Sequence, residues 1–221
     1  ASPIKKANGV DPTQPQTTLQ MPSAAIMDKV QSSWYLSKRA ANIYLVVDTS
    51  GSMADENKLK QAQDALSTFL DQVQGTNDRV GLVPFANSVY GTIPLKDITT
   101  QRAALKNQVN LFAANGRTAL LDAVSYAYDD LQKRNERDRI NAIVVMTDGI
   151  ENASSISQSA LTQKIKRTNT SGVPVLIFCI GYGSDADFSV LSALADPTGG
   201  FARRADPDTI KKLYKILSTY F

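Results

Sequence analysis

The sequence predicts an α/β fold: a doubly wound, mostly parallel central sheet with one antiparallel edge strand and helices on both faces. Two observations lead to this prediction. From residue 42 onward, short apolar runs of strand length recur along the chain, as is typical of strands buried on both faces. Between them lie longer segments whose apolar residues recur with helical spacing. Strands that alternate with helices through short connections form parallel sheets with both faces covered.

The expected strands are apolar runs bounded by polar or glycine-containing turns. They comprise residues 42–47, 79–85, 88–95, 141–146, 175–180 and 200–204. Only Ala86–Asn87 separates the second run from the third, which predicts that these two strands are tightly joined. Because Pro84 and Pro94 lack a backbone N–H, we expect the strand 88–95 to lie at the antiparallel edge.

The expected helices are recognised by an apolar face and by capping residues. They comprise residues 58–73, a helix capped by Thr99 or Thr100, a longer helix after Thr118, residues 156–167, residues 188–195, and a final helix that begins at Asp206–Pro207. Residues 1–41 differ, because their first part is rich in Pro, Gln and Thr and shows little periodicity. We expect residues 1–41 to be an N-terminal extension with a short helix near Trp34, and residues 42–221 to be the main domain.

Composition excludes several classes of function. Lys and Arg number 24 against 21 for Asp and Glu, and acids interrupt the basic residues, so we expect no nucleic-acid partner. The chain has no His, which excludes Ser-His-Asp and Cys-His catalysis and zinc sites that need imidazole. The single cysteine, Cys179, lies in an apolar run and is expected to be a core residue instead of a nucleophile. No stretch reaches the length of a membrane span. Because the chain begins at Ala1, we interpret it as processed or excised from a longer protein.

Oxygen-bearing side chains follow two of the expected strands. Asp48, Ser50 and Ser52 alternate along the loop after residues 42–47, and Asp148 follows residues 141–146. The carboxyl ends of parallel strands meet at one edge of the sheet, where ligands bind. Carboxylates and hydroxyls without nitrogen or sulfur suit a hard cation such as Mg²⁺. The simpler interpretation is a helix cap and turn, since Asp and Ser bond local amides, but a second strand-end aspartate favours the metal site.

These residues resemble a known family. Residues 48–52, Asp-Thr-Ser-Gly-Ser, resemble the Asp-x-Ser-x-Ser signature of von Willebrand factor A domains, and the match runs in order over about residues 42–221. Thr118 is similar to the family's metal-site threonine, and Asp148 to its closing aspartate. The resemblance implies a Rossmann-like fold and a metal-ion-dependent adhesion site. There the hydroxyls of Ser50, Ser52 and Thr118 would be ligands, and Asp48 and Asp148 would bind directly or through water.

The resemblance also implies a function. We expect a non-enzymatic, divalent-cation-dependent protein-binding module that holds Mg²⁺, with Mn²⁺ or Ca²⁺ as alternatives. A partner protein would complete the metal's shell with an Asp or Glu carboxylate. Residues 180–187 and Gly199–Gly200 resemble bacterial members in which this domain follows an extracellular solute-binding-like domain. On that ground we expect an extracytoplasmic or cell-surface location within a larger multidomain protein, with residues 1–41 as the tail of a preceding domain.

One residue departs from the pattern, and three other interpretations compete with this one. Arg117 stands where bacterial relatives often carry Gly, and would either attract an acidic partner or point to solvent. Asp48 and Asp148 could instead serve a metal-dependent phosphohydrolase, although Ser50 replaces the second aspartate such enzymes need. Residues 181–186 fit a loose dinucleotide fingerprint, although nearby acids would repel a pyrophosphate. The fold could also leave the site empty, which the intact set of ligand positions opposes.

Overall fold

The computed structural model describes residues 39–73, 75, 77–183 and 185–205, together with residues 23 and 26. Contacts divide the chain into two units, Ala1–Lys38 and Arg39–Phe221, and the fold below belongs to the second. The helix expected near Trp34 and the final helix expected from Asp206 fall outside the described residues. Within the described part of the chain, no helix combines the length and the apolar character needed to cross a bilayer.

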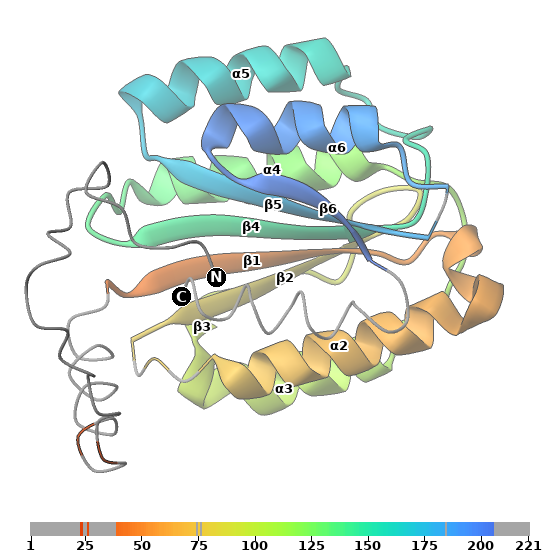
Figure 1. The fold of residues 1–221 in the computed structure, drawn as a ribbon, viewed down its shortest axis with the longest axis horizontal. Helices are drawn as coiled ribbons and strands as arrows, with labels where there is room; N and C mark the ends of the chain where they lie inside the picture. The colour runs from red at the N-terminus through yellow and green to blue at the C-terminus, as the bar shows by residue number, and fades with distance from the viewer. Residues whose placement is uncertain are drawn as a thin grey trace, which may run out of the picture. The chain divides into compact units, whose positions relative to one another are not determined.

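A six-stranded sheet forms the centre of this unit (Figure 1). Its strands are β1 (Ala41–Asp48), β2 (Arg79–Phe85), β3 (Ile93–Asp97), β4 (Ile140–Thr147), β5 (Val175–Tyr182) and β6 (Phe201–Ala205). The order across the sheet is β3-β2-β1-β4-β5-β6, and only β3 pairs with its neighbour in the antiparallel direction. The mostly parallel sheet with one antiparallel edge strand is therefore confirmed.

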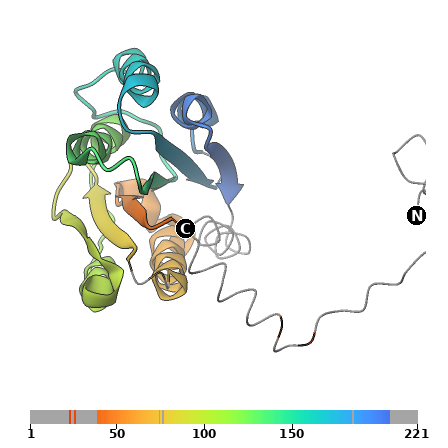
Figure 2. The same ribbon diagram turned by 90° about the vertical axis from the view of Figure 1, so that its left-hand side faces the viewer.

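Helices cover both faces of the sheet, as Figures 1 and 2 show from two directions. They are α2 (Lys58–Gln72), α3 (Ile98–Asn110), α4 (Leu120–Arg134), α5 (Gln158–Ser171) and α6 (Phe188–Ala195), with short 3₁₀ segments η2 (Gly51–Asn57) and η3 (Asp196–Thr198). The helices α2 and α3 share a buried apolar cluster with one face of the sheet, and α4, α5 and α6 share one with the other face. The chain is thus doubly wound, as predicted.

The central strands are apolar without interruption because both of their faces are buried. In β1, Ile43 and Leu45 pack into the cluster with α2 and α3, whereas Tyr44 and Val46 pack into the cluster with α4. Cys179 of β5 is fully buried, and burial raises the pKa of its thiol, so the expectation of a core cysteine is confirmed.

The edge strand begins later than the sequence predicts. Residues 88–95 were expected to form it directly after a two-residue connection, but β3 begins at Ile93, and before it only an isolated bridge joins Phe85 to Val89. The pairing of Arg79 with Asp97 and of Leu82 with Ile93, with a register shift between, sets where the strand starts. That register depends on contacts between strands, so the apolar run alone could not reveal it.

The cap of α3 also differs from the prediction. Thr99 or Thr100 was expected to cap this helix, but the N-cap is Asp97. Its carboxylate accepts hydrogen bonds from the Thr99 backbone N–H at 2.8 Å and the Thr99 hydroxyl at 2.7 Å. A carboxylate is favoured at a helix N-terminus because it accepts hydrogen bonds from free N–H groups and because its negative charge is attracted to the positive end of the helix dipole. The helix therefore begins at Ile98, before both threonines.

Candidate metal centre

Strand pairing brings the two predicted aspartates to one edge of the sheet. The strands β1 and β4 are parallel neighbours, and Val47 pairs with Met146 just before each strand ends. Asp48 is the last residue of β1, and Asp148 immediately follows β4. Both carboxylates are fully buried. In Figure 1 this edge lies where the chain passes from β1 into η2.

The Asp48 carboxylate is held by its own loop and by β4. Its Oδ1 accepts a hydrogen bond from the Ser50 backbone N–H at 2.7 Å, and its Oδ2 accepts one from the Thr147 hydroxyl. Burial raises the pKa of Asp48 to about 6, although these hydrogen bonds act to lower it. The group is thus largely ionised at neutral pH and has a fixed orientation.

Hydroxyl groups link the loop after β1 to the loop after β4. The Ser50 and Ser52 hydroxyl oxygens are 3.3 Å apart, and the Ser52 hydroxyl donates to Asp148 Oδ1 at 2.8 Å. Ser50 is buried and Ser52 partly so. These two serines and Asp148 form a continuous row of oxygen atoms, although Ser52 and Asp148 are far apart in the sequence.

Thr118 reaches the same place from a third loop. Its backbone N–H donates to Asn152 Oδ1 at 3.0 Å, and its carbonyl accepts from the Asn152 N–H at 3.1 Å, which fixes the loop. A β-carbon at Gly149 would lie only 2.9 Å from Thr118 Oγ1 and 3.5 Å from Asp48 Oδ2. The absence of a side chain at Gly149 therefore leaves room for the Thr118 hydroxyl and the Asp48 carboxylate beside this residue.

Backbone hydrogen bonds join the first and third loops. The Gly51 N–H donates to the Gly116 carbonyl at 3.0 Å, and the Asn115 N–H donates to the Thr49 carbonyl at 2.9 Å. Gly116 has a φ of +82°, a conformation that favours glycine. The loop after β1 and the loop before α4 are thus held together by their main chains, independently of the candidate ligands.

One further residue at this site, Lys58, could not be identified from sequence patterns. Its ammonium donates to Asp148 Oδ2 at 2.8 Å, and the two side chains are 6% and 0% exposed. Burial alone would lower the pKa of Lys58, but the hydrogen bond and charge of Asp148 outweigh it and raise that pKa above its ordinary value. Lys58 was assigned only to the start of a helix, because nothing in its sequence neighbourhood indicates a contact with a residue so far along the chain.

Arg117 is exposed and also makes contacts within the protein. Its guanidinium donates to the carbonyl of Asn152, the residue that also fixes Thr118. Its backbone N–H donates to Asn87 Oδ1 at 2.8 Å. Arg117 therefore ties the loop before α4 to the loop after β4.

A hollow of about 360 Å³ lies beside the loop after β1. Its lining includes Thr49 from that loop, Tyr90 from the β2–β3 connection, and Leu111 and Phe112 after α3. Leu111 is 75% exposed, and the Tyr90 hydroxyl is 2.7 Å from the Thr49 hydroxyl. The surface next to the candidate metal centre is therefore both hollowed and partly apolar.

The helix that follows the dinucleotide-like pattern of residues 181–186 is already capped at its N-terminus. The Asp187 carboxylate accepts hydrogen bonds from the backbone N–H groups of Ser189 at 2.9 Å and Val190 at 3.3 Å, and so caps α6. A pyrophosphate would need those same N–H groups. Asp206 follows the pattern at the spacing expected of a ribose-binding acid, but it lies outside the described residues. The nucleotide-binding alternative is therefore not favoured.

Comparison with known protein families agrees with this geometry. The sequence model of the von Willebrand factor type A domain matches residues 42–216. The chain belongs to this family. The matched range includes the three loops just described and the whole of the sheet apart from Ala41, the first residue of β1.

Relatives with von Willebrand factor type A similarity include heavy chains of inter-alpha-trypsin inhibitor. The chain is 27% identical over 183 residues to heavy chain H4 from Homo sapiens, covering 79% of this chain and 19% of that protein. It is 30% identical over 177 residues to heavy chain H4 from Sus scrofa, covering 76% of this chain and 18% of that protein. The chain thus spans about a fifth of the length of these relatives.

Solved structures share the fold. A von Willebrand factor type A protein from Catenulispora acidiphila has a TM-score of 0.68 at 21% identity, covering 81% of this chain and 42% of that chain. The pilus adhesin SpaC from Lactobacillus rhamnosus GG also has a TM-score of 0.68, at 16% identity, covering 83% of this chain and 30% of that chain.

The donor set fits the divalent cation often held by von Willebrand factor type A domains. Two carboxylates and three hydroxyls approach from three loops, and hard cations prefer such oxygen ligands. Among the described residues, no three His, Cys, Asp or Glu side chains gather into a metal-binding group. One carboxylate oxygen, Asp148 Oδ2, already has a cationic partner in Lys58.

Proposed function

We propose that this chain is a divalent-cation-dependent protein-binding module. Asp48, Ser50, Ser52, Thr118 and Asp148 would hold Mg²⁺, with Mn²⁺ or Ca²⁺ as alternatives. A glutamate or aspartate of a partner protein would supply a further oxygen ligand. Mg²⁺ favours six oxygens in a near-octahedral arrangement. Because the protein supplies few charged ligands, the cation keeps part of its positive charge and an open coordination position, and the partner's carboxylate can bind there.

The arrangement of oxygen atoms at the carboxyl edge of the sheet supports this proposal. Hydrogen bonds connect Ser50, Ser52 and Asp148 in a row, and Thr118 and Asp48 both lie beside Gly149. Keeping the buried Asp48 carboxylate ionised is costly unless a cation compensates its charge, and the described residues offer it hydrogen bonds from the Ser50 N–H and the Thr147 hydroxyl. Membership in a family that commonly mediates protein interactions and adhesion also supports it. We propose that the module has no enzymatic activity, since neither the phosphohydrolase nor the nucleotide-binding alternative gains support from these contacts.

Isothermal titration with Mg²⁺ tests the proposal. The wild-type chain should bind one cation, and Asp148→Asn should remove most of the affinity because it replaces a charged ligand by a neutral amide. Asn keeps an oxygen for Lys58, so the variant should fold, which circular dichroism can verify. The control is Asp64→Asn, which removes an exposed carboxylate on α2 that pairs with Lys60 in the same helix. Absence of cation binding to the wild-type chain would reject the proposal.

We further propose an extracytoplasmic or cell-surface location, within a larger protein. Two observations support it: a pilus adhesin is among the similar structures, and the chain spans about a fifth of the curated relatives. The separation of Ala1–Lys38 from Arg39–Phe221 supports the proposed boundary near residue 41 between an N-terminal extension and the domain that continues to residue 221. The extension would be the tail of a preceding domain.

A further inference from the structure

Lys58 occupies a position that local preferences do not explain. It is the first residue of α2, where the helix dipole disfavours a positive charge. It is also buried, and burying an ammonium is costly unless it is paired. The two residues before it, Glu56 and Asn57, have φ values of +51° and +60°, which non-glycine residues rarely adopt. These unfavourable features are offset by a contact elsewhere in the fold.

That contact is Asp148. The Lys58 side chain passes the connection after β5, where a β-carbon at Gly183 would lie 3.6 Å from Lys58 Cε, and its ammonium ends 2.8 Å from Asp148 Oδ2. Asp148 Oδ1 accepts from the Ser52 hydroxyl at 2.8 Å. Both oxygens of this candidate ligand are therefore paired, one of them with a full positive charge.

We propose that Lys58 is a built-in cation that competes with the divalent metal for Asp148, and so makes cation binding depend on the acidic partner. The inference rests on the proposed function. Counted at their formal charges, Asp48, Asp148 and Lys58 sum to one negative charge. A bound divalent cation changes the total to one positive charge, whereas without Lys58 the total would be zero. Lys58 thus weakens binding of the cation alone and leaves a positive charge for an incoming carboxylate.

Mn²⁺ binding, followed by electron paramagnetic resonance, tests this competition. Lys58→Met keeps much of the apolar stem and removes the charge, and it should tighten Mn²⁺ binding by about tenfold or more. The matched control is Lys60→Met on the same helix, because the Lys60 side chain is 64% exposed and pairs with Asp64. That control should bind Mn²⁺ as the wild-type chain does.

Acetate serves as the carboxylate probe for the second half of the proposal. Sodium acetate, compared with sodium chloride at equal ionic strength, should tighten Mn²⁺ binding by the wild-type chain. The same change should be smaller in Lys58→Met, because that variant leaves no excess positive charge. An equal effect of acetate on both chains would overturn this part of the inference.

Thermal unfolding provides a second measurement in case the variant is unstable. Removing one partner of a buried ion pair leaves an uncompensated charge, so Lys58→Met should melt at a lower temperature in EDTA. Mg²⁺ should then raise its melting temperature by more than it raises that of the wild-type chain. Should Lys58→Met not fold at all, a ¹⁵N signal of the wild-type Lys58 ammonium must shift when Mg²⁺ is added, and no shift overturns the inference.

The outcomes separate the two proposals. If the wild-type chain binds Mn²⁺ and folded Lys58→Met binds it no more tightly, Lys58 does not compete and only this inference fails. If neither the wild-type chain nor Lys58→Met binds Mn²⁺, the proposed metal centre fails and the inference fails with it. Binding by Lys58→Met alone would show that Lys58 competes with the cation, but it would reject the proposed function, which requires the wild-type chain to bind the cation.

Discussion

At the scale of single residues, Thr118 offers the cleanest test of the candidate ligand set. Its loop is positioned by the backbone hydrogen bonds to Asn152, at 3.0 and 3.1 Å, and not through the side-chain hydroxyl. Thr118→Ala should therefore leave the fold intact and remove one oxygen ligand. We expect Mg²⁺ affinity to fall by about tenfold to a hundredfold, similar to other losses of metal-site groups, as measured by titration calorimetry.

The control for this variant is Thr170→Ala. Thr170 lies on the exposed part of α5, where its hydroxyl donates to the Lys166 carbonyl of the same helix. Its Mg²⁺ affinity should equal that of the wild-type chain. If Thr118→Ala also binds Mg²⁺ with wild-type affinity, the threonine is not a ligand and the proposed set must be revised.

The residue scale also shows where sequence reasoning reached its limit. Asp48 and Asp148 could be located because each follows an apolar run, and parallel strands bring such positions to one edge. Thr118 could be assigned only by family resemblance, since it lies in a loop. Lys58 could not be assigned to the site at all, because its contact with Asp148 depends on the fold. Local sequence patterns thus reveal the candidate ligands but not the positive charge of Lys58 that pairs with one of them.

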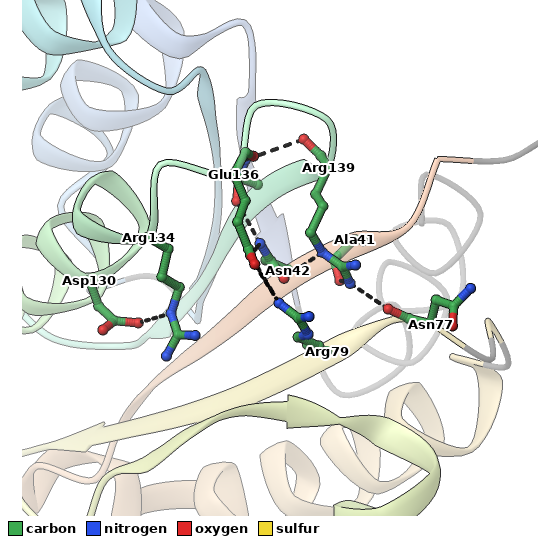
Figure 3. A network of polar contacts seen from close by, with 9 residues as sticks. Ala41, Asn42, Asn77, Arg79, Asp130, Arg134, Glu136 and Arg139 are labelled. Atoms are coloured by element: carbon green, nitrogen blue, oxygen red, sulfur yellow. Dashed lines mark hydrogen bonds and ion pairs between the residues drawn. The ribbon is translucent and has the colours of Figure 1, made fainter.

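At the scale of elements, a polar network fixes the amino ends of the central strands (Figure 3). Glu136 accepts two hydrogen bonds from Arg79 of β2, at 2.7 and 3.0 Å, and one from Asn42 of β1 at 2.8 Å. Asn42 also bonds Asn141 of β4 at 2.9 Å. Arg139 donates to Asn42 at 2.8 Å. The Glu136 side chain therefore links β1 and β2, and Asn42 extends the network to β4, at the edge opposite the candidate metal centre.

Replacing this carboxylate should lower stability in a pH-dependent way. Burial acts to raise the pKa of Glu136, but hydrogen bonds and the charge of Arg79 outweigh it and hold the pKa below its ordinary value. A lowered folded-state pKa stabilises the protein above the unfolded-state pKa, and the stabilisation is lost as the pH falls through the folded-state value. Glu136→Gln should cost about 1–2 kcal/mol at neutral pH, and the difference should shrink below about pH 4.

Urea unfolding at neutral and acid pH measures this effect. The control is Asp64→Asn, which removes an exposed carboxylate whose helical pair with Lys60 should contribute no more than about 0.5 kcal/mol. A difference between wild type and Glu136→Gln that stays constant with pH would show that the carboxylate's charge is not what stabilises the network.

The elements themselves differ in how well the sequence predicts them. Apolar patterns predict buried strands such as β4 and helices such as α6. A strand buried on both faces is a continuous apolar run, whereas a helix buried on one face has apolar residues at helical spacing. The expected helix 188–195 matches α6 without change. The edge strand β3 and the 3₁₀ segment η2 did not follow, since strand register and two left-handed residues at Glu56 and Asn57 decide them. Sequence patterns thus missed one element set by long-range pairing, β3, and one set by unusual backbone angles, η2.

At the scale of the whole molecule, the candidate ligands come together only in the complete fold. They come from the loop after β1, the loop before α4 and the loop after β4, which are distant in sequence and meet only when the sheet has formed. The unfolded chain cannot assemble them, so a cation that binds the native state must stabilise the entire domain. Magnesium should therefore raise the melting temperature and not merely order one loop.

The size of that rise can be predicted. A free concentration about 100 times the dissociation constant stabilises a protein by about 2.7 kcal/mol. For a domain of this size each kcal/mol shifts the melting temperature by about 2–4 °C, so Mg²⁺ should add about 5–10 °C over a sample in EDTA. Scanning calorimetry should show this rise growing with the logarithm of the Mg²⁺ concentration, and NaCl at equal ionic strength should not reproduce it. Asp148→Asn should not show this rise. If millimolar Mg²⁺ leaves the melting temperature of the wild-type chain unchanged, that result would contradict cation binding to the native fold.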